Sequence, residues 1–472
     1  MLAYIAPIIV FGIVIFVHEF GHFVAAKLMG VYAPRFSIGF GPALFRARRG
    51  ETEYVLAALP LGGFVRMASR HDAETAFLEG GAESDGLKPG DKGFDPEAMI
   101  PFGPKPVPES RWFESKSLAA RLFIMIAGVT MNVLLAFVVL TVLGMKYGEV
   151  VIGTRVVGAV HAPPTAPGLA ALQPGDTILA VNGQNVANWN QIRERIDAAT
   201  GTLVLTTSRG PVSVPLETSG TSAAPSIGAS IDFFIPPVIG DLLPGSPAAR
   251  AGLAAGDSVI SIGHLPVQSW SDLQRRVGPS AGAALPFEVR RGARLVSVTV
   301  RPDSTAQKDP RTGTSSTVGK IGAIPADFST RAPIGVGAAM REGARQTAQT
   351  AGKVLGVVRG LLTREVSVGQ LGGPIAITRA SVAAARSGME SLFLLVALLS
   401  VNVAVLNLLP IPILDGGQIV INVAEAVKGS PFTTRTRENI LRVGLVAILL
   451  IFAMSTFNDL RGLKDAVAHL FG

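Results

Sequence analysis

The residues most suited to chemistry in this 472-residue sequence are His18 and His22, separated by Glu19, Phe20 and Gly21. On a helix, positions i and i+4 share one face, so both imidazoles can bind a single zinc ion. Glu19 then lies beside the metal as a general base for an activated water. The pair stands in an apolar segment, where ionisable side chains are costly and usually functional. The chain has only six histidines, so the spacing predicts a catalytic zinc site rather than a histidine pair of the hydrophobic core.

A catalytic zinc ion needs a third protein ligand and one open position. No His or Glu follows the pair shortly downstream in helical register. The best distant candidate is Asp415, in the apolar segment Asn407-Leu408-Leu409-Pro410-Ile411-Pro412-Ile413-Leu414-Asp415-Gly416-Gly417. Two prolines and two glycines break this helix, and irregular backbone at membrane depth is tolerated only where it is buried in protein or lines a wet cavity. Taken alone, the interruption also fits the broken helix of a transporter.

Four apolar segments must position these ligands. They cover about Ile5–Ala26, Leu118–Met145, Ser391–Leu409 and about Leu441–Phe457. The first lacks the basic start and the small-residue cleavage site of a signal peptide. Only 16% of the residues are charged, against about a quarter in soluble domains, which excludes an ordinary soluble protein. The absence of cysteine excludes disulfides, thiolate metal sites and a cysteine nucleophile, and the net charge of +8 gives little support to nucleic-acid binding.

Loop charges predict the orientation of the spans. The 27–49 segment contains basic residues and no acidic one, and the loop between the third and fourth spans contains Lys428, Arg435, Arg437 and Arg442. By the positive-inside rule, both loops are cytoplasmic. Both termini and the 147–390 stretch then lie outside, which is the periplasm in a bacterium. The helical rise puts His22 roughly 7–8 Å from the cytoplasmic boundary at Lys27.

The outer stretch contains an internal repeat, in which residues 172–193 match 253–274. Each copy continues to an Arg-Gly turn and ends in an Ile-Gly-Ala tripeptide, Ile227-Gly228-Ala229 and Ile321-Gly322-Ala323. The order of short strands, one helix and a Gly-Asp turn resembles a circularly permuted bacterial PDZ domain. The resemblance implies that the tripeptides lie at peptide grooves, where backbone N–H groups capture a chain end. The alternative is that their glycines are simple turn residues.

The His-Glu-x-x-His sequence and the Asn-x-x-Pro-x-Pro-x-Leu-Asp-Gly-Gly sequence together resemble the site-2 protease family of intramembrane zinc metalloproteases. The resemblance implies Zn²⁺ on His18, His22 and Asp415, with Glu19 as the base. It also implies that Asn407 holds the substrate or the oxyanion near the metal; a helix-capping or packing asparagine is the alternative. The second span has Gly128-Val129-Thr130-Met131-Asn132 where the family often has Gly-Pro-x-x-Asn, so Asn132 could equally serve helix packing.

Three further segments bear on the resemblance. Glu51–Met67 alternates partly like a strand pair around a Pro-Leu-Gly-Gly turn. The family has a membrane-associated β-hairpin here, whose open edge could receive an unwound substrate; a plain cytoplasmic hairpin is the alternative. Leu371–Ile375 also resembles a family motif, and Ile334–Leu362 could form an amphipathic helix on the outer membrane face. The acidic, Gly- and Pro-rich 71–110 loop is predicted to be a solvated insertion without an assigned function.

The predicted fold class is a multi-span α-helical membrane protein with four transmembrane helices, a membrane-associated β-hairpin and two α+β PDZ-like domains between spans two and three. The predicted parts are the first helix (1–29), a cytoplasmic loop with hairpin and insertion (30–117), the second helix (118–146), two PDZ-like domains (147–234 and 235–330), a periplasmic connector (331–390), the third segment (391–428), and a loop with the fourth helix (429–472).

The resemblance implies an inner-membrane zinc endopeptidase that acts within or near transmembrane segments. Its partners would be the lipid bilayer and a single-span substrate, either an anti-sigma factor already trimmed outside or remnant signal peptides, and no nucleic acid. The PDZ pair would filter substrates by size or receive their tails. A non-catalytic PDZ scaffold that binds protein C-termini is the rival, but it predicts a broken metal site. A transporter predicts repeats among the spans, whereas the clear repeat lies outside them.

Overall fold

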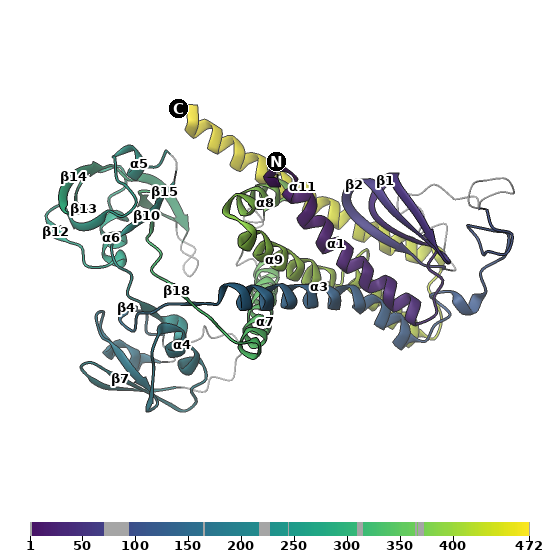
Figure 1. The fold of residues 1–472 in the computed structure, drawn as a ribbon, viewed down its shortest axis with the longest axis horizontal. Coiled ribbons are helices and arrows are strands. Elements are labelled where there is room, and N and C mark those ends of the chain that lie inside the picture. Colours follow the sequence, from purple (N-terminus) through teal and green to yellow (C-terminus); the bar gives the residue numbers. More distant parts are fainter. Residues whose placement is uncertain are drawn as a thin grey trace. The chain divides into compact units, whose positions relative to one another are not determined.

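The computed structural model describes residues 2–69, 94–163, 166–216, 227–243, 245–308, 315–363, 366 and 372–471. The chain divides into two compact units (Figure 1): a helical unit made of Met1–Gly148 and Pro333–Gly472, and a β-rich unit made of Glu149–Ala332. Most of the insertion predicted at 71–110 lies outside the described residues, apart from its last part from 94 onward.

Four helices of the described chain are long and apolar enough to cross a membrane: α1 (Leu2–Leu28), α3 (Leu118–Tyr147), α9 (Met389–Asn407) and α11 (Thr434–Phe471). They correspond to the four apolar segments of the sequence, so this prediction is confirmed. The span in α11 covers Thr434–Leu460 and begins earlier than expected, because the basic residues before the apolar stretch already belong to the helix.

The first three of these helices pack together, whereas α11 is loosely held. Val10 and Val14 of α1 are buried against Val396 of α9, and Ala26 of α1 is buried in one cluster with Ile124 of α3. Only 11% of the apolar window of α11 is buried inside the protein, against 44% for α9. A helix that leaves so much apolar surface uncovered requires lipid around it.

A long β-hairpin lies beside α1 and consists of β1 (Arg35–Arg49) and β2 (Thr52–Arg66) (Figure 1). The predicted strand pair was incomplete: both arms of Glu51–Met67 pair with β1, which belongs to the basic segment before them. The Pro-Leu-Gly-Gly stretch lies inside β2, and residues 53–56 and 63–66 both pair with residues 35–38. The sequence did not predict β1 as a strand, because its arginines are typical of a solvated loop.

The described part of the helical unit also contains α7 (Val336–Leu362), α8 (Pro374–Ser387) and α10 (Asp415–Lys428). The helix predicted over Ile334–Leu362 corresponds to α7, which packs against α3 at Gly343 and Thr141. Of the motif at 371–375, Leu371 lies outside the described residues. The N-terminal N–H groups of Gly373, Ile375 and Ala376 donate to the Asp459 carboxylate of α11, which ties α8 to that helix.

The β-rich unit consists of two halves that share one arrangement of strands and helices. The first half contains β3 (Glu149–Val151), β4 (Val157–Val160), η2 (Pro167–Ala171), β5 (Ile178–Val181), β6 (Gln184–Asn185), α4 (Trp189–Asp197), β7 (Thr202–Thr207), β8 (Gly210–Pro215), η3 (Ile227–Ser230) and β9 (Ile231–Phe233). The second contains β10 (Ile239–Leu242), α5 (Pro247–Arg250), β11 (Ser258–Ile262), β12 (Leu265–Pro266), α6 (Trp270–Val277), β13 (Leu285–Arg291), β14 (Arg294–Val300), β15 (Asp303–Lys308), β16 (Ser315–Lys320), β17 (Ala323–Pro325) and β18 (Thr330–Ala332). The four-stranded sheets have the equivalent orders β6-β5-β7-β8 and β12-β11-β13-β14.

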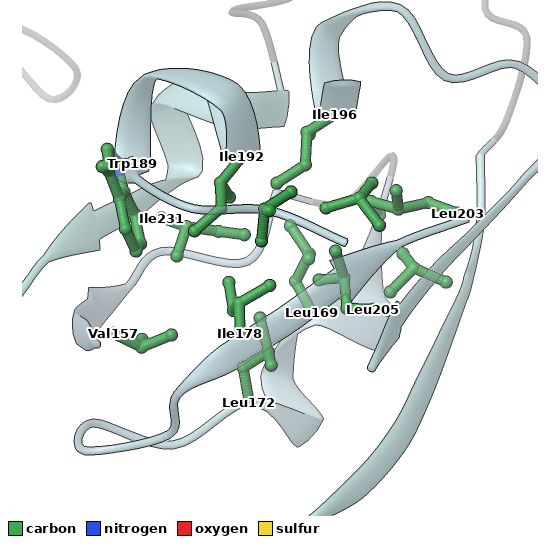
Figure 2. Close-up of a cluster of buried hydrophobic side chains, with 14 residues drawn as sticks. Val157, Leu169, Leu172, Ile178, Trp189, Ile192, Ile196, Leu203, Leu205 and Ile231 are labelled. Carbon is green, nitrogen blue, oxygen red and sulfur yellow. The ribbon is translucent and has the colours of Figure 1, made fainter. Parts of the chain in front are cut away.

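Each half has its own hydrophobic core under its helix. Figure 2 shows Ile192 and Ile196 of α4 directed at Leu203 and Leu205 of β7, with Trp189 at the edge of the same cluster. Trp270 and Leu273 of α6 take the same places in the second core. The helix periodicity and the alternation of the strands therefore bury one continuous face in each copy.

An ion pair between a buried aspartate and a half-exposed arginine also recurs in both halves. Asp176 and Asp257 follow the matching Gly-Asp turns and are almost completely buried. Asp176 is paired with Arg209, in the turn between β7 and β8, and Asp257 with Arg291, the last residue of β13. The Arg291 guanidinium holds the pKa of the Asp257 carboxyl below its ordinary value, against the effect of burial.

Candidate metal centre

Three side chains converge on one point in the helical unit. The Nε2 atoms of His18 and His22 lie 3.2 Å apart, and Asp415 Oδ2 lies 3.2 Å from the first and 3.4 Å from the second. Ligand atoms around a tetrahedral zinc ion at its usual bond lengths are separated by about 3.3 Å. Asp415 Oδ2 is buried and has no hydrogen-bond partner among the described residues. The three atoms therefore fit a zinc ion.

The local fold explains how a residue so far along the chain reaches the histidine pair. The chain leaves helical structure after Asn407, and α10 begins at Asp415, so the carboxylate stands at a helix start. A Cβ at Gly416 would lie 2.2 Å from Leu408 O, and one at Gly417 would lie 2.1 Å from Ile411 O. Only glycine allows the helix start to pack this tightly on the unwound segment.

The second nitrogen of each imidazole is also held. His22 Nδ1 donates to Ile124 O at 2.8 Å, and because a carbonyl can only accept, this bond leaves the Nε2 lone pair free for a metal. His18 Nδ1 lies 3.3 Å from the Asn132 amide, whose Oδ1 is buried without a partner among the described residues. With the amide oxygen and nitrogen exchanged, Oδ1 would accept a hydrogen bond from His18 Nδ1–H.

His18, His22 and Asp415 line a cavity of about 760 Å³. Its other lining residues include Glu19, Phe40, Gly63 and Asn407. Asn407 Nδ2 lies 3.0 Å from His18 Nε2, beside the three ligand atoms. A Cβ at Gly63 would lie 3.0 Å from Glu19 Cγ, so β2 runs directly past the carboxyl side chain. A carboxyl side chain, a polar amide and a strand thus border one cavity.

The structure brings His18, Glu19, His22, Asn407 and Asp415 together, as the sequence analysis expected of these five residues. The two Ile-Gly-Ala tripeptides lie elsewhere, in the β-rich unit: Ile227–Ser230 form η3, and Ile321-Gly322-Ala323 lead into β17.

The sequence analysis missed two contributors to the centre. Phe40 lies on β1, in the segment interpreted as a basic loop, and the apolar run before the arginines was the only signal for it. Gly128 was noted only as part of a motif, yet a Cβ there would lie 2.3 Å from His22 Nε2. The contact arises from the pairing of α1 with α3, which the residue spacing within one helix does not reveal.

Comparison with known proteins gives a consistent result along nearly the whole chain. The sequence profile of peptidase family M50 matches residues 6–451. A Neisseria meningitidis protein that carries the provisional name zinc metalloprotease is 31% identical, over 97% of this chain and 98% of that relative. Proteins named regulator of sigma-E protease are 29% identical in Salmonella typhimurium and 28% in Escherichia coli, each over 96% of this chain and 97% of the relative.

Proposed function

This chain belongs to peptidase family M50, the site-2 protease family, and on that premise we propose that it is a zinc metalloprotease that hydrolyses a peptide bond within or near the transmembrane segment of a single-span membrane protein. The convergence of His18, His22 and Asp415 carries the proposal. A zinc ion held there would supply a Lewis acid that polarises the scissile carbonyl and makes a nearby water more acidic.

The other residues of the centre have complementary roles. The Glu19 carboxylate takes a proton from the attacking water and later delivers it to the nitrogen of the leaving amine. The Asn407 amide holds the substrate or the developing oxyanion through Nδ2–H, since it lies at the ligand cluster and on the cavity wall. Ile124 O and Asn132 fix the imidazole rings, so little reorganisation accompanies the reaction.

We propose that the hairpin presents the substrate to the centre. A peptide bond in a helix is shielded by its own hydrogen bonds, so the substrate must unwind before hydrolysis. An extended segment could add to an edge of the β1–β2 sheet, which would supply main-chain hydrogen bonds in place of those lost. Phe40 and Gly63 of this sheet line the same cavity as Glu19, which supports this placement.

The names of the relatives support a substrate class. We propose an anti-sigma factor already trimmed outside by another protease, with remnant signal peptides as a second class. The termini and the β-rich unit would face the periplasm of a bacterial inner-membrane protein. The predicted parts of the chain, with PDZ-like domains at 147–234 and 235–330, would then place a size filter or tail receptor before the membrane centre.

The decisive experiment compares the purified protein with Glu19→Gln on a model single-span substrate, with and without a zinc chelator. Glu438→Gln, which changes an exposed carboxylate paired with Arg442 on α11, is the matched control. We expect cleavage by the unaltered protein and by the control, strong loss in Glu19→Gln, and loss on chelation that added zinc restores.

Equal cleavage by Glu19→Gln would contradict the role of this carboxylate as the base. Cleavage that persists after complete removal of zinc would contradict the metal mechanism. No cleavage by any of the proteins, despite full zinc loading, would favour the non-catalytic PDZ scaffold.

A further inference from the structure

The two Ile-Gly-Ala tripeptides have different surroundings, although the halves that contain them share one fold. In the first half, Gly228 N–H donates to the Asp197 carboxylate at 3.1 Å. Gly228 is buried, and even a Cβ added to it would lie 2.6 Å from Asp197 Oδ1. Asp197 is the last residue of α4, so the helix end carries a carboxylate directly onto this backbone donor.

The second half has no carboxylate at the matching helix end. The repeat that pairs Trp189 with Trp270 pairs Asp197 with Gly278, the residue that follows α6. Within the described residues, no side chain accepts a hydrogen bond from Gly322 N–H. A cavity of about 690 Å³ lies between α6 and the second tripeptide.

This second cavity is lined by both apolar and charged side chains. Its apolar residues include Leu273, Val277 and Val318, and its charged residues are Asp303, which is paired with Arg250, and Lys320, which stands directly before the tripeptide. A chain that ends in an apolar residue suits such a site, because the side chain can enter the apolar part while the terminal carboxylate meets backbone N–H groups and the lysine.

We propose that Asp197 occupies the carboxylate position of the first groove, so that only the second groove receives a free C-terminus ending in an apolar residue. The proposal rests on the PDZ role proposed above and deepens it. A ligand of the first groove would have to displace a carboxylate already bonded to Gly228 N–H and would bring a like charge beside it, whereas Gly278 leaves the second groove open.

The test uses the full chain in detergent and a fluorescent peptide with an apolar C-terminal residue, as the free acid and as the C-terminal amide. We expect one acid-specific site per chain in the unaltered protein. Gly278→Asp should weaken that site by at least about tenfold, because a like charge then faces the ligand. Asp197→Ala, and Asp197→Gly as a second variant that copies residue 278, should each add a second acid-specific site.

Two substitutions serve as matched controls. Asp232→Ala removes an exposed carboxylate of the first half, and Gly153→Asp adds one where a Cβ meets nothing within 4 Å. Neither should change the number or the affinity of sites. Two acid-specific sites in the unaltered protein would overturn the proposal, as would folded Asp197 variants that gain none. Cleavage of the model substrate is measured in parallel, so that failure of the protease function is told apart from failure of this inference.

Discussion

Residues away from the metal ligands decide how well those ligands are held. Asn132 is completely buried and lies next to His18 Nδ1, while Ile124 O takes the corresponding place at His22. Such partners fix the ring orientation and commonly change metal affinity by 10- to 100-fold when removed. The Asn132 carboxamide, for which the sequence left helix packing open, therefore lies where it can orient the His18 ring.

We predict that Asn132→Leu weakens zinc binding about 10- to 100-fold, because the His18 Nδ1–H loses its acceptor in a buried site. Asn132→Asp keeps an acceptor of the same size and should retain more affinity than the leucine variant. Competition with a fluorescent zinc chelator measures the affinities, and Thr130→Ala on the exposed face of α3 is the control. Unchanged affinity in Asn132→Leu would contradict this role.

The close approach at Gly128 leads to a second prediction. Gly128→Ala places a methyl group 2.3 Å from the position of His22 Nε2, so the ring must move and zinc content and cleavage should both fall sharply. Gly12→Ala is the matched control, since a Cβ there meets nothing within 4 Å and alanine is the better helix former by about 1 kcal/mol. Zinc is quantified by metal analysis. A full zinc content in Gly128→Ala would contradict the prediction that the added methyl group displaces the His22 ring.

The cluster of His18, His22 and Asp415 was predictable at the residue scale, whereas the residues that surround it were not. His18 and His22 are related by a spacing within one helix, and Asp415 stands in an interruption that only a cavity tolerates, so both signals are local in the sequence. Asn132, Gly128 and Phe40 meet the centre only through the packing of α3 and β1 against α1. No periodicity within a single element encodes such contacts.

At the scale of elements, a charge cluster ties the hairpin to two other segments. Glu51, in the turn between β1 and β2, accepts two hydrogen bonds from Arg111 at 2.8 and 2.9 Å and also pairs with Lys27 at the end of α1. These bonds, chiefly those from Arg111, lower the pKa of the Glu51 carboxyl to about 2. The cluster joins the strands to the helix that carries the histidine pair.

We predict that Glu51→Gln loosens the hairpin without removing the metal ligands. Backbone hydrogen exchange over residues 35–66, measured by mass spectrometry, should be faster at neutral pH than in the unaltered protein. The same substitution at Glu97, an exposed partner of Lys105, is the control and should have no effect there. Equal protection of the hairpin in Glu51→Gln would show that the cluster does not hold it.

The pH dependence follows from the direction of the pKa shift. Because the folded-state pKa of Glu51 lies below its ordinary value of 4.5, its stabilisation is complete above about pH 4.5 and disappears as the pH falls toward 2. The difference in thermal midpoint between the unaltered protein and Glu51→Gln should therefore shrink across this interval. A difference in thermal midpoint that grows on acidification would contradict a stabilising role of the ionised Glu51 carboxylate.

The elements themselves were unequally predictable. The four spans follow from length and hydropathy, because lipid imposes both on a helix. The strand pair at Glu51–Met67 was predicted without β1, because β1 carries its apolar residues and its arginines in separate blocks rather than in alternation. Hydrogen bonding to β2, and not residue pattern, makes this segment a strand.

At the scale of the whole molecule, the two units differ in the interactions that hold each of them together. The repeat predicted two similar modules, but the sequence alone did not show that their grooves differ, since the contact of Asp197 with Gly228 arises only from folding. The helical unit has apolar clusters between its spans and leaves much of their apolar surface uncovered. The β-rich unit has two small cores and the pairs of the buried Asp176 and Asp257 with their arginines.

This division predicts that the β-rich unit can be destabilised while the metal centre stays intact. Asp257 is fully buried and bonded through both oxygens to Arg291, so Asp257→Asn should lower the stability of this unit by about 1–3 kcal/mol. Trp189 and Trp270, two of the three tryptophans of the chain, report its unfolding by fluorescence. The Asp257 pKa lies below its ordinary value, so the difference in stability from the unaltered protein is largest near neutrality and diminishes as acid protonates the carboxyl.

Asp303→Asn, which affects an exposed pair with Arg250, is the control and should leave the fluorescence transition unchanged. Zinc content should be equal in all three proteins, and its loss together with the fluorescence transition in Asp257→Asn would mean that the two units unfold as one.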